Sequence, residues 1–126
     1  MELIRSVAHL DSGSENSGNF HDYVAIAYNS STRQYLLVNF TTLRGNGNPF
    51  SIRVKKKDFS ALLRHDSEIE FGRPKELSES ELKSLLKIAP NGRPYSCPPQ
   101  LLERILAKIK EGTEMEKGIA RKYSLL

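Results

Sequence analysis

The apolar residues between positions 22 and 40 alternate with the period of a β-strand and predict two neighbouring strands joined by a hairpin turn. Residues 22–28 are apolar on both faces, with Val24, Ile26 and Tyr28 on one and Tyr23, Ala25 and Ala27 on the other. Residues 33–40 follow the same pattern, with Leu36, Val38 and Phe40 on one face and Tyr35, Leu37 and Asn39 on the other. Strands of this kind lie in the middle of a sheet, and residues 29–32 between them have the length and composition of a turn.

Shorter segments on either side predict further strands. Residues 2–8 and 51–54 have the apolar content of short strands, and residues 68–71 alternate between glutamate and apolar residues, which is typical of a half-exposed strand. Gly72-Arg73-Pro74 is expected to end that last strand. Between these segments, residues 57–63 predict one or two helical turns.

The second half of the chain predicts two helices. Residues 78–88 carry a leucine stripe, and Ser78 followed three residues later by Glu81 forms a capping-box pattern. Residues 98–110 open on two prolines and then repeat apolar residues at helical spacing, which predicts an amphipathic helix docked on the sheet.

Strands followed by helices indicate an α+β fold. We expect a single domain over residues 1–126, with a small antiparallel sheet or open β-barrel and two C-terminal helices. Its parts are a β-rich region, 1–72, a helical region, 77–111, and an irregular basic tail, 112–126, that apolar residues anchor.

Composition predicts the compartment of the protein and gives its net charge. A chain of 126 residues with Cys97 as its one cysteine forms no internal disulfide, and it has neither a secretory signal pattern nor a membrane-length apolar run, so we expect a cytoplasmic protein. The net charge is +4. One group of cations forms a candidate nucleic-acid-binding run, comprising Arg53, Lys55, Lys56 and Lys57. A solvated surface is the alternative interpretation of this run.

A metal site or another cofactor is not expected. The candidate ligands His9, His21, His65 and Cys97 show none of the paired spacings of zinc sites.

Metal-free cleavage of a phosphodiester by its 2′-hydroxyl needs a base, an acid and a cation for the developing charge. His21 begins one strand of the hairpin, and Thr41, Thr42 and Arg44 end the other, so antiparallel pairing brings these residues near one another. In this hypothesis His21 is the acid or base, the threonines hold phosphate and Arg44 stabilises charge. In the alternative, the threonines reflect strand propensity and His21 only caps a loop.

The segment His65-Asp66-Ser67 has two interpretations as well. Contiguous residues cannot form a catalytic triad by themselves, and Asp66 and Ser67 are typical of a turn. Alternatively, His65 joins the same site as His21 from a neighbouring strand.

The order HDYVAIAYN, turn, QYLLVNFTTLRG resembles the central hairpin of the PemK/MazF toxin superfamily, and residues 68–71 are similar to a later strand of its barrel. The resemblance covers about residues 20–72, and it places Thr41 and Thr42 where that family carries a hydroxyl residue. The family's N-terminal catalytic arginine has no counterpart, and His21 stands where an Arg-Pro pair is expected. The resemblance implies a metal-independent endoribonuclease, often a homodimer, with an antitoxin-like protein partner.

Three functions therefore stand as hypotheses: a protein of this toxin type acting on RNA, a protein-interaction module that uses residues 98–110 and the tail, and a plain nucleic-acid-binding module whose affinity depends steeply on salt.

Overall fold

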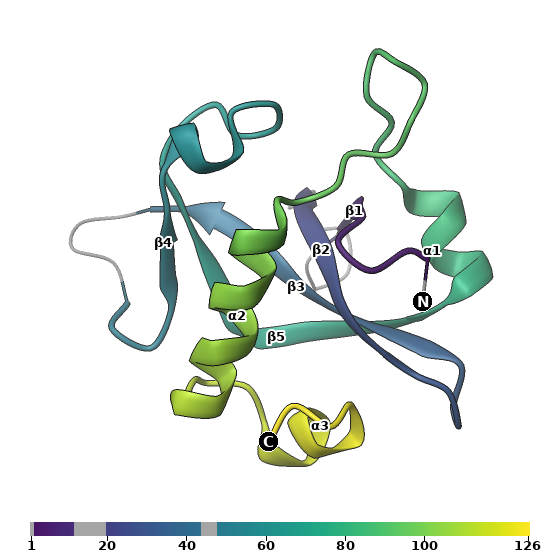
Figure 1. Ribbon diagram of the computed structural model, residues 1–126, viewed down its shortest axis with the longest axis vertical. Helices are drawn as coiled ribbons and strands as arrows, with labels where there is room; N and C mark the ends of the chain where they lie inside the picture. Colours follow the sequence, from purple (N-terminus) through teal and green to yellow (C-terminus); the bar gives the residue numbers. More distant parts are fainter. Residues whose placement is uncertain (1, 12–19, 44–47) are drawn as a thin grey trace.

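One antiparallel sheet of five strands, in the order β1-β2-β3-β5-β4, forms the frame of the protein (Figure 1). The computed structural model describes residues 2–11, 20–43 and 48–126. The strands are β1 (Val7–Asp11), β2 (Phe20–Asn29), β3 (Gln34–Thr42), β4 (Ile52–Val54) and β5 (Ser67–Ser78). The helices are a 3₁₀ helix η1 (Lys56–Phe59), α1 (Glu79–Leu85), α2 (Pro99–Glu111) and α3 (Lys117–Lys122). The predicted α+β class is confirmed, and the sheet is open.

The predicted central hairpin is formed by β2 and β3. The side chain of Asn29 holds its turn, because Oδ1 accepts hydrogen bonds from the backbone N–H of Ser31 at 2.8 Å and of Thr32 at 3.1 Å. Arg33 then adopts a left-handed conformation with φ of 57°, and its N–H donates to the carbonyl of Asn29 at 2.7 Å. The sequence predicts this hairpin correctly because polar side chains within the turn close it locally.

A bulge in β2 changes which residues share a face. The register with β3 shifts between Ala25 and Ala27. Ala27 therefore joins Ile26 in the larger buried cluster, while Tyr28 packs with Tyr23 against the smaller one. The predicted placement of Ala27 and Tyr28 was wrong, because an extra residue in one strand reverses the alternation beyond it.

The prediction that this strand ends at Gly72-Arg73-Pro74 was wrong. Strand β5 continues to Ser78. Asn39 lies opposite Glu70 and Leu37 lies opposite Lys75, so the intervening residues of β5 bulge out opposite a single residue of β3. Proline lacks an N–H for a regular ladder, and Pro74 lies in this irregular part of the strand. Before the bulge, β5 pairs with β4 and with the end of β3. After the bulge, β5 pairs with the start of β3, next to the hairpin turn.

Two smaller predictions also need correction. The first strand was placed at residues 2–8 but begins at Val7, because Arg5 has φ of 79° and residues 2–5 form turns. The helix predicted over 57–63 is only η1, followed by a turn.

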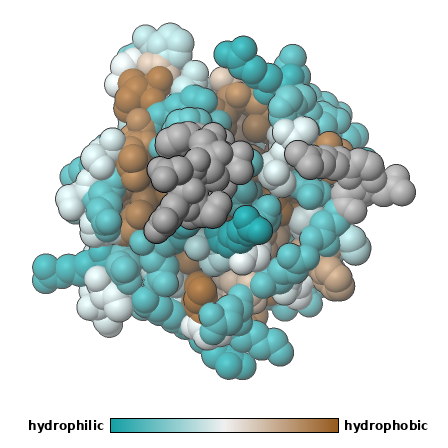
Figure 2. Space-filling view, turned by 180° about the vertical axis from the view of Figure 1, so that it is seen from behind, coloured by the Kyte–Doolittle hydropathy of each residue, from teal (hydrophilic) through white to brown (hydrophobic). Residues whose placement is uncertain are grey.

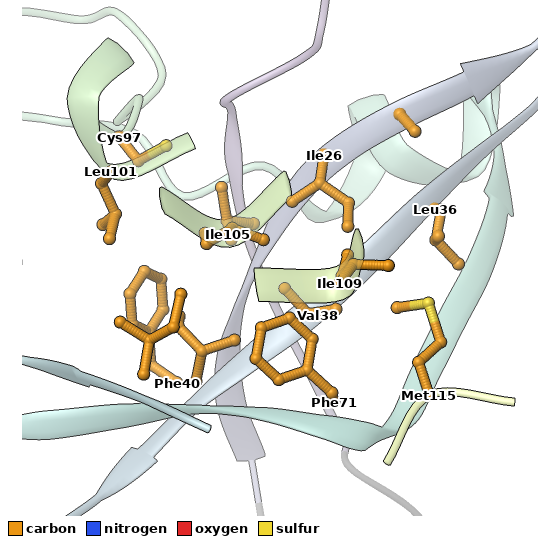
Figure 3. Close-up of a cluster of buried hydrophobic side chains, with 14 of the residues drawn as sticks. Ile26, Leu36, Val38, Phe40, Phe71, Cys97, Leu101, Ile105, Ile109 and Met115 are labelled. Carbon is orange, nitrogen blue, oxygen red and sulfur yellow. The ribbon is translucent and has the colours of Figure 1, made fainter. Parts of the chain in front are cut away.

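Helix α2 covers one face of the sheet and buries its apolar stripe there (Figure 3). Leu101, Ile105 and Ile109 point from the helix toward sheet residues that include Ile26 and Phe71. The helix ends at Glu111, and Gly112, where φ is 137°, follows as its C-cap. The structure thus confirms an amphipathic helix docked on the sheet.

The opposite face carries a smaller cluster, against which α1 packs Leu82. The predicted capping box is present, with Ser78 Oγ accepting from the Glu81 N–H at 3.2 Å and Glu81 Oε1 accepting from the Ser78 N–H at 2.9 Å. Seen from this side, the surface is largely hydrophilic with a strip of hydrophobic residues (Figure 2). No helix in the described part of the chain is long and apolar enough to cross a membrane.

The tail predicted to be irregular contains α3, and it is held by both apolar and polar contacts. Met115 and Tyr123 are buried, as predicted for anchors, and Tyr123 Oη donates to Glu76 Oε2 on β5 at 2.8 Å. Lys122 Nζ forms an ion pair with the same carboxylate. These bonds, the one from Lys122 first, hold the pKa of Glu76 below its ordinary value of 4.5.

Replacing Glu76 with glutamine is expected to remove a pH-dependent part of the stability. The unfolded chain binds the Glu76 proton more readily than the folded one, so the charged form stabilises the fold above about pH 4.5, and this stabilisation is lost as pH falls through the lower folded pKa. Urea unfolding between about pH 7 and pH 3 measures the difference between wild type and Glu76→Gln. The difference should shrink with acid. A constant difference, or one matched by Glu103→Gln at an exposed position on α2, would contradict the assignment.

Candidate active site

A polar pocket lies at the end of the sheet where β1 and β3 finish and where β2 and β5 start. The register shows this directly, since Leu10 lies opposite His21 and Thr42 lies opposite Ser67. The pocket has a volume of about 240 Å³. Its polar lining comes from separate segments of the chain and comprises His9, His21, Asp22, Thr41, Thr42, Arg64, His65, Ser67 and Lys87.

Four residues predicted to share a site do line this one pocket. His21, Thr41 and Thr42 come together through the pairing of β2 with β3, and His65 arrives from the turn before β5. Arg44, the predicted charge-stabilising residue, lies outside the described residues. The structure therefore brings the described members of the predicted site together, while their catalytic roles stay predictions.

Asp22 links two further pocket residues that the sequence reasoning did not assign to the site. Its Oδ1 lies 3.0 Å from Nδ1 of His9, and its Oδ2 accepts from Lys87 Nζ at 3.3 Å. His9 and Asp22 lie directly opposite each other on β1 and β2. Lys87 is positioned by its own backbone, whose N–H donates to the carbonyl of Val7 at 2.8 Å. The register of β1 with β2 and the path of the chain after α1 bring these three residues together, although they are far apart in sequence.

The turn before β5 combines both interpretations offered for it. Asp66 Oδ1 accepts from the backbone N–H of Lys56 at 2.9 Å, and Ser67 Oγ donates to the carbonyl of His65 at 3.3 Å, so these two side chains serve the turn. Leu63 is buried and anchors the segment. The exposed residues Arg64 and His65 follow it directly, and both line the pocket.

The charge of the pocket favours an anion. Arg64 and Lys87 are cationic, three histidines add imidazole nitrogens, and Asp22 is the acidic residue of the lining. The carboxylate of Asp22 is engaged by His9 and Lys87. Phosphate groups match this combination of cations, imidazoles and hydroxyls.

The predicted nucleic-acid-binding run divides between two surfaces. All four of its residues are exposed. Lys56 lines a hollow beside the histidine pocket, whereas Arg53 lines another hollow together with Arg104 and Lys108 of α2. Lys55 lies between them, and Lys57 follows in η1. Two residues of the run therefore line different hollows, and its role in binding nucleic acid stays a prediction.

Within the described ranges, no three His, Cys, Asp or Glu side chains are grouped so that they could hold a metal ion. Cys97, considered above as a ligand, is fully buried in the larger core cluster, and burial raises the pKa of its thiol to about 11. Its position beside α2 makes it a packing residue.

The chain matches no protein-family model and no curated protein sequence. The resemblance to the PemK/MazF superfamily therefore rests on the residues that carry it. What the fold and the pocket define is a small α+β protein with a histidine-rich, cationic pocket at one end of an open sheet.

Proposed function

We propose that this pocket cleaves RNA without a metal ion, by attack of a ribose 2′-hydroxyl on the adjacent phosphodiester. The observation that carries the proposal is the convergence of His9, His21 and His65 on one pocket that also holds Arg64 and Lys87. Acid–base catalysis of this reaction needs two titratable groups and a cation, and the pocket supplies both kinds.

In this proposal each residue of the pocket has a separate role. His9, oriented by Asp22, takes the proton from the 2′-hydroxyl as its oxygen bonds to phosphorus. His21 or His65 gives a proton to the 5′-oxygen as the phosphorus–oxygen bond to the next nucleotide breaks. Arg64, Lys87 and the hydroxyls of Thr41 and Thr42 bind the phosphorane oxygens. The products are a 2′,3′-cyclic phosphate and a 5′-hydroxyl end, so atoms and protons balance.

The experiment is an incubation of the purified chain with mixed RNA in EDTA, with the His21→Ala variant, purified identically, beside it. Mass spectrometry identifies the new ends. Cyclic 2′,3′-phosphates made by the wild type alone support a metal-free ribonuclease with His21 in its site. Equal cleavage by both proteins removes His21 from the site, and an absence of cleavage by either removes the proposal.

A second candidate, docking of a protein partner, is favoured by a hollow between α2 and α3. The hollow has a volume of about 380 Å³ and combines apolar residues with three cations and one carboxylate: Ile109, Met115, Ala120, Leu126, Lys110, Lys117, Arg121 and Glu111. These suit an acidic, amphipathic segment such as an antitoxin-like partner presents. The apolar stripe of α2 itself is occupied by the sheet.

Variants at this hollow test the partner more cleanly than deletion of the tail, because residues 112–126 contain Met115 and Tyr123 of the core. Arg121→Glu, at an exposed position, should abolish capture of a specific partner without unfolding the chain. Unchanged capture would place the contact elsewhere. A homodimer, which the resemblance implies, is a separate proposal that analytical ultracentrifugation tests.

A further inference from the structure

A second hollow adjoins the histidine pocket and shares part of its wall. It has a volume of about 530 Å³, and Leu62, Leu63, Arg64 and Lys87 line both spaces. The second hollow extends from these shared residues to Lys56 and Tyr95. The two spaces are therefore neighbours that meet at these four residues.

The charge of this second hollow is entirely positive. Lys56, Arg64 and Lys87 line it, and none of its described lining residues is acidic. In the part of the chain that the structure describes, the side chains of Lys56 and Arg64 are exposed and form no ion pair. The nearby carboxylate of Asp66 is held by the backbone N–H of Lys56. Such cations suit the phosphate backbone of a nucleic acid.

Tyr95 adds an aromatic surface whose backbone position is fixed. Its N–H donates to the carbonyl of Lys87 at 2.9 Å, and its carbonyl accepts from the N–H of Val7 at 2.9 Å. Tyr95 is half-buried, and it lines both the cationic hollow and a shallower one that Pro90 and Pro94 help to form. Val7 lies two residues before His9 on β1. The backbone of Tyr95 is therefore hydrogen-bonded to the strand that carries one of the pocket histidines.

We infer that this hollow is a binding subsite for the nucleotide next to the one in the histidine pocket, and that its ligand is single-stranded RNA. The phosphate lies on Lys56 and Arg64, and the base stacks on Tyr95. A base is free to stack on a protein ring only when it is unpaired, which excludes a regular duplex from this subsite. The inference rests on the proposed function, because it takes the histidine pocket as the place of the neighbouring phosphodiester.

Binding tests the subsite separately from cleavage when the probe is a fluorescein-labelled 2′-O-methyl RNA strand, which has no free 2′-hydroxyl to attack. Base stacking predicts that Tyr95→Leu weakens binding of this strand by about 5- to 150-fold, whereas Tyr95→Phe keeps the ring and stays within about twofold. Lys56→Ala should reduce the slope of log affinity against log salt by about 0.7. Lys83→Ala, an exposed lysine on α1, is the matched control and should leave the slope unchanged.

The inference is overturned if Tyr95→Leu and Lys56→Ala both bind like the wild type, or if a duplex of the same sequence binds as tightly as the single strand. Circular dichroism checks the fold of each variant, and Lys56→Ala decides the matter if Tyr95→Leu does not fold. Tyr95-dependent binding by a chain that does not cleave RNA would remove the proposed ribonuclease and keep the subsite. Cleavage that continues while Tyr95→Leu and Lys56→Ala both bind normally would remove the subsite and keep the ribonuclease.

Discussion

Replacing His9 with alanine is expected to lower the rate of RNA cleavage in EDTA by about two to four orders of magnitude, the usual contribution of a positioned general acid or base. The reason is geometric. His9 is the pocket histidine whose Nδ1 lies 3.0 Å from a carboxylate oxygen of Asp22, so its ring is held in one orientation. Single-turnover rates on a labelled oligonucleotide measure the effect directly.

Two companion measurements separate catalysis from folding. Added imidazole should restore part of the activity of His9→Ala, because a lost proton acceptor can be replaced from solution and a collapsed fold cannot. Asp22→Asn should lose less activity than His9→Ala, since asparagine keeps an oxygen near the ring but removes the charge. A His9→Ala variant that cleaves within about twofold of wild type would transfer the role of base to His21 or His65.

Replacing Ile105 with alanine is expected to destabilise the fold by about 2–5 kcal/mol. Ile105 is completely buried in the middle of α2, where it lies between the helix and the sheet (Figure 3). The loss combines the transfer of the side chain from the core with the cavity that it leaves. Since a domain is commonly stable by only about 5–15 kcal/mol, this single change removes a large part of the total.

Urea unfolding followed by circular dichroism measures this loss, with Glu103→Ala as the control on the same helix. Glu103 is exposed, so its replacement should change the free energy of unfolding by less than about 0.5 kcal/mol. Comparable effects at the two positions would mean that α2 does not dock on the sheet in the way described.

Local chemistry made part of this fold predictable. The turn at Asn29 and the capping box at Ser78 and Glu81 are closed by side chains within three residues, so their patterns can be found in the sequence alone. The bulges of β2 and β5 depend on how neighbouring strands pair, and no local pattern reports this. That is why the face of Tyr28 and the end of β5 were predicted incorrectly.

The residues of the candidate site also divide into those that the sequence predicted and those that it did not. His21, Thr41 and Thr42 were found because a hairpin brings the outer ends of its two strands together. The contact of His9 with Asp22 requires the register of β1, and the contact of Lys87 requires the path of the chain after α1. Both contacts depend on tertiary structure, so the sequence did not predict them, whereas His65 was placed in the site as one of two interpretations of its segment.

The two outer strands of the sheet have a consequence for aggregation and assembly. Open hydrogen-bonding edges let sheets of separate molecules join into larger ones. At β1 the start of the outer edge is occupied, because Val7 exchanges hydrogen bonds with Lys87 and Tyr95. At the other side, β4 is only three residues long, and Arg104 donates to the carbonyl of Arg53 within it. These contacts cover Val7 on one outer strand and the carbonyl of Arg53 on the other, and both oppose growth of the sheet by strand addition at those positions.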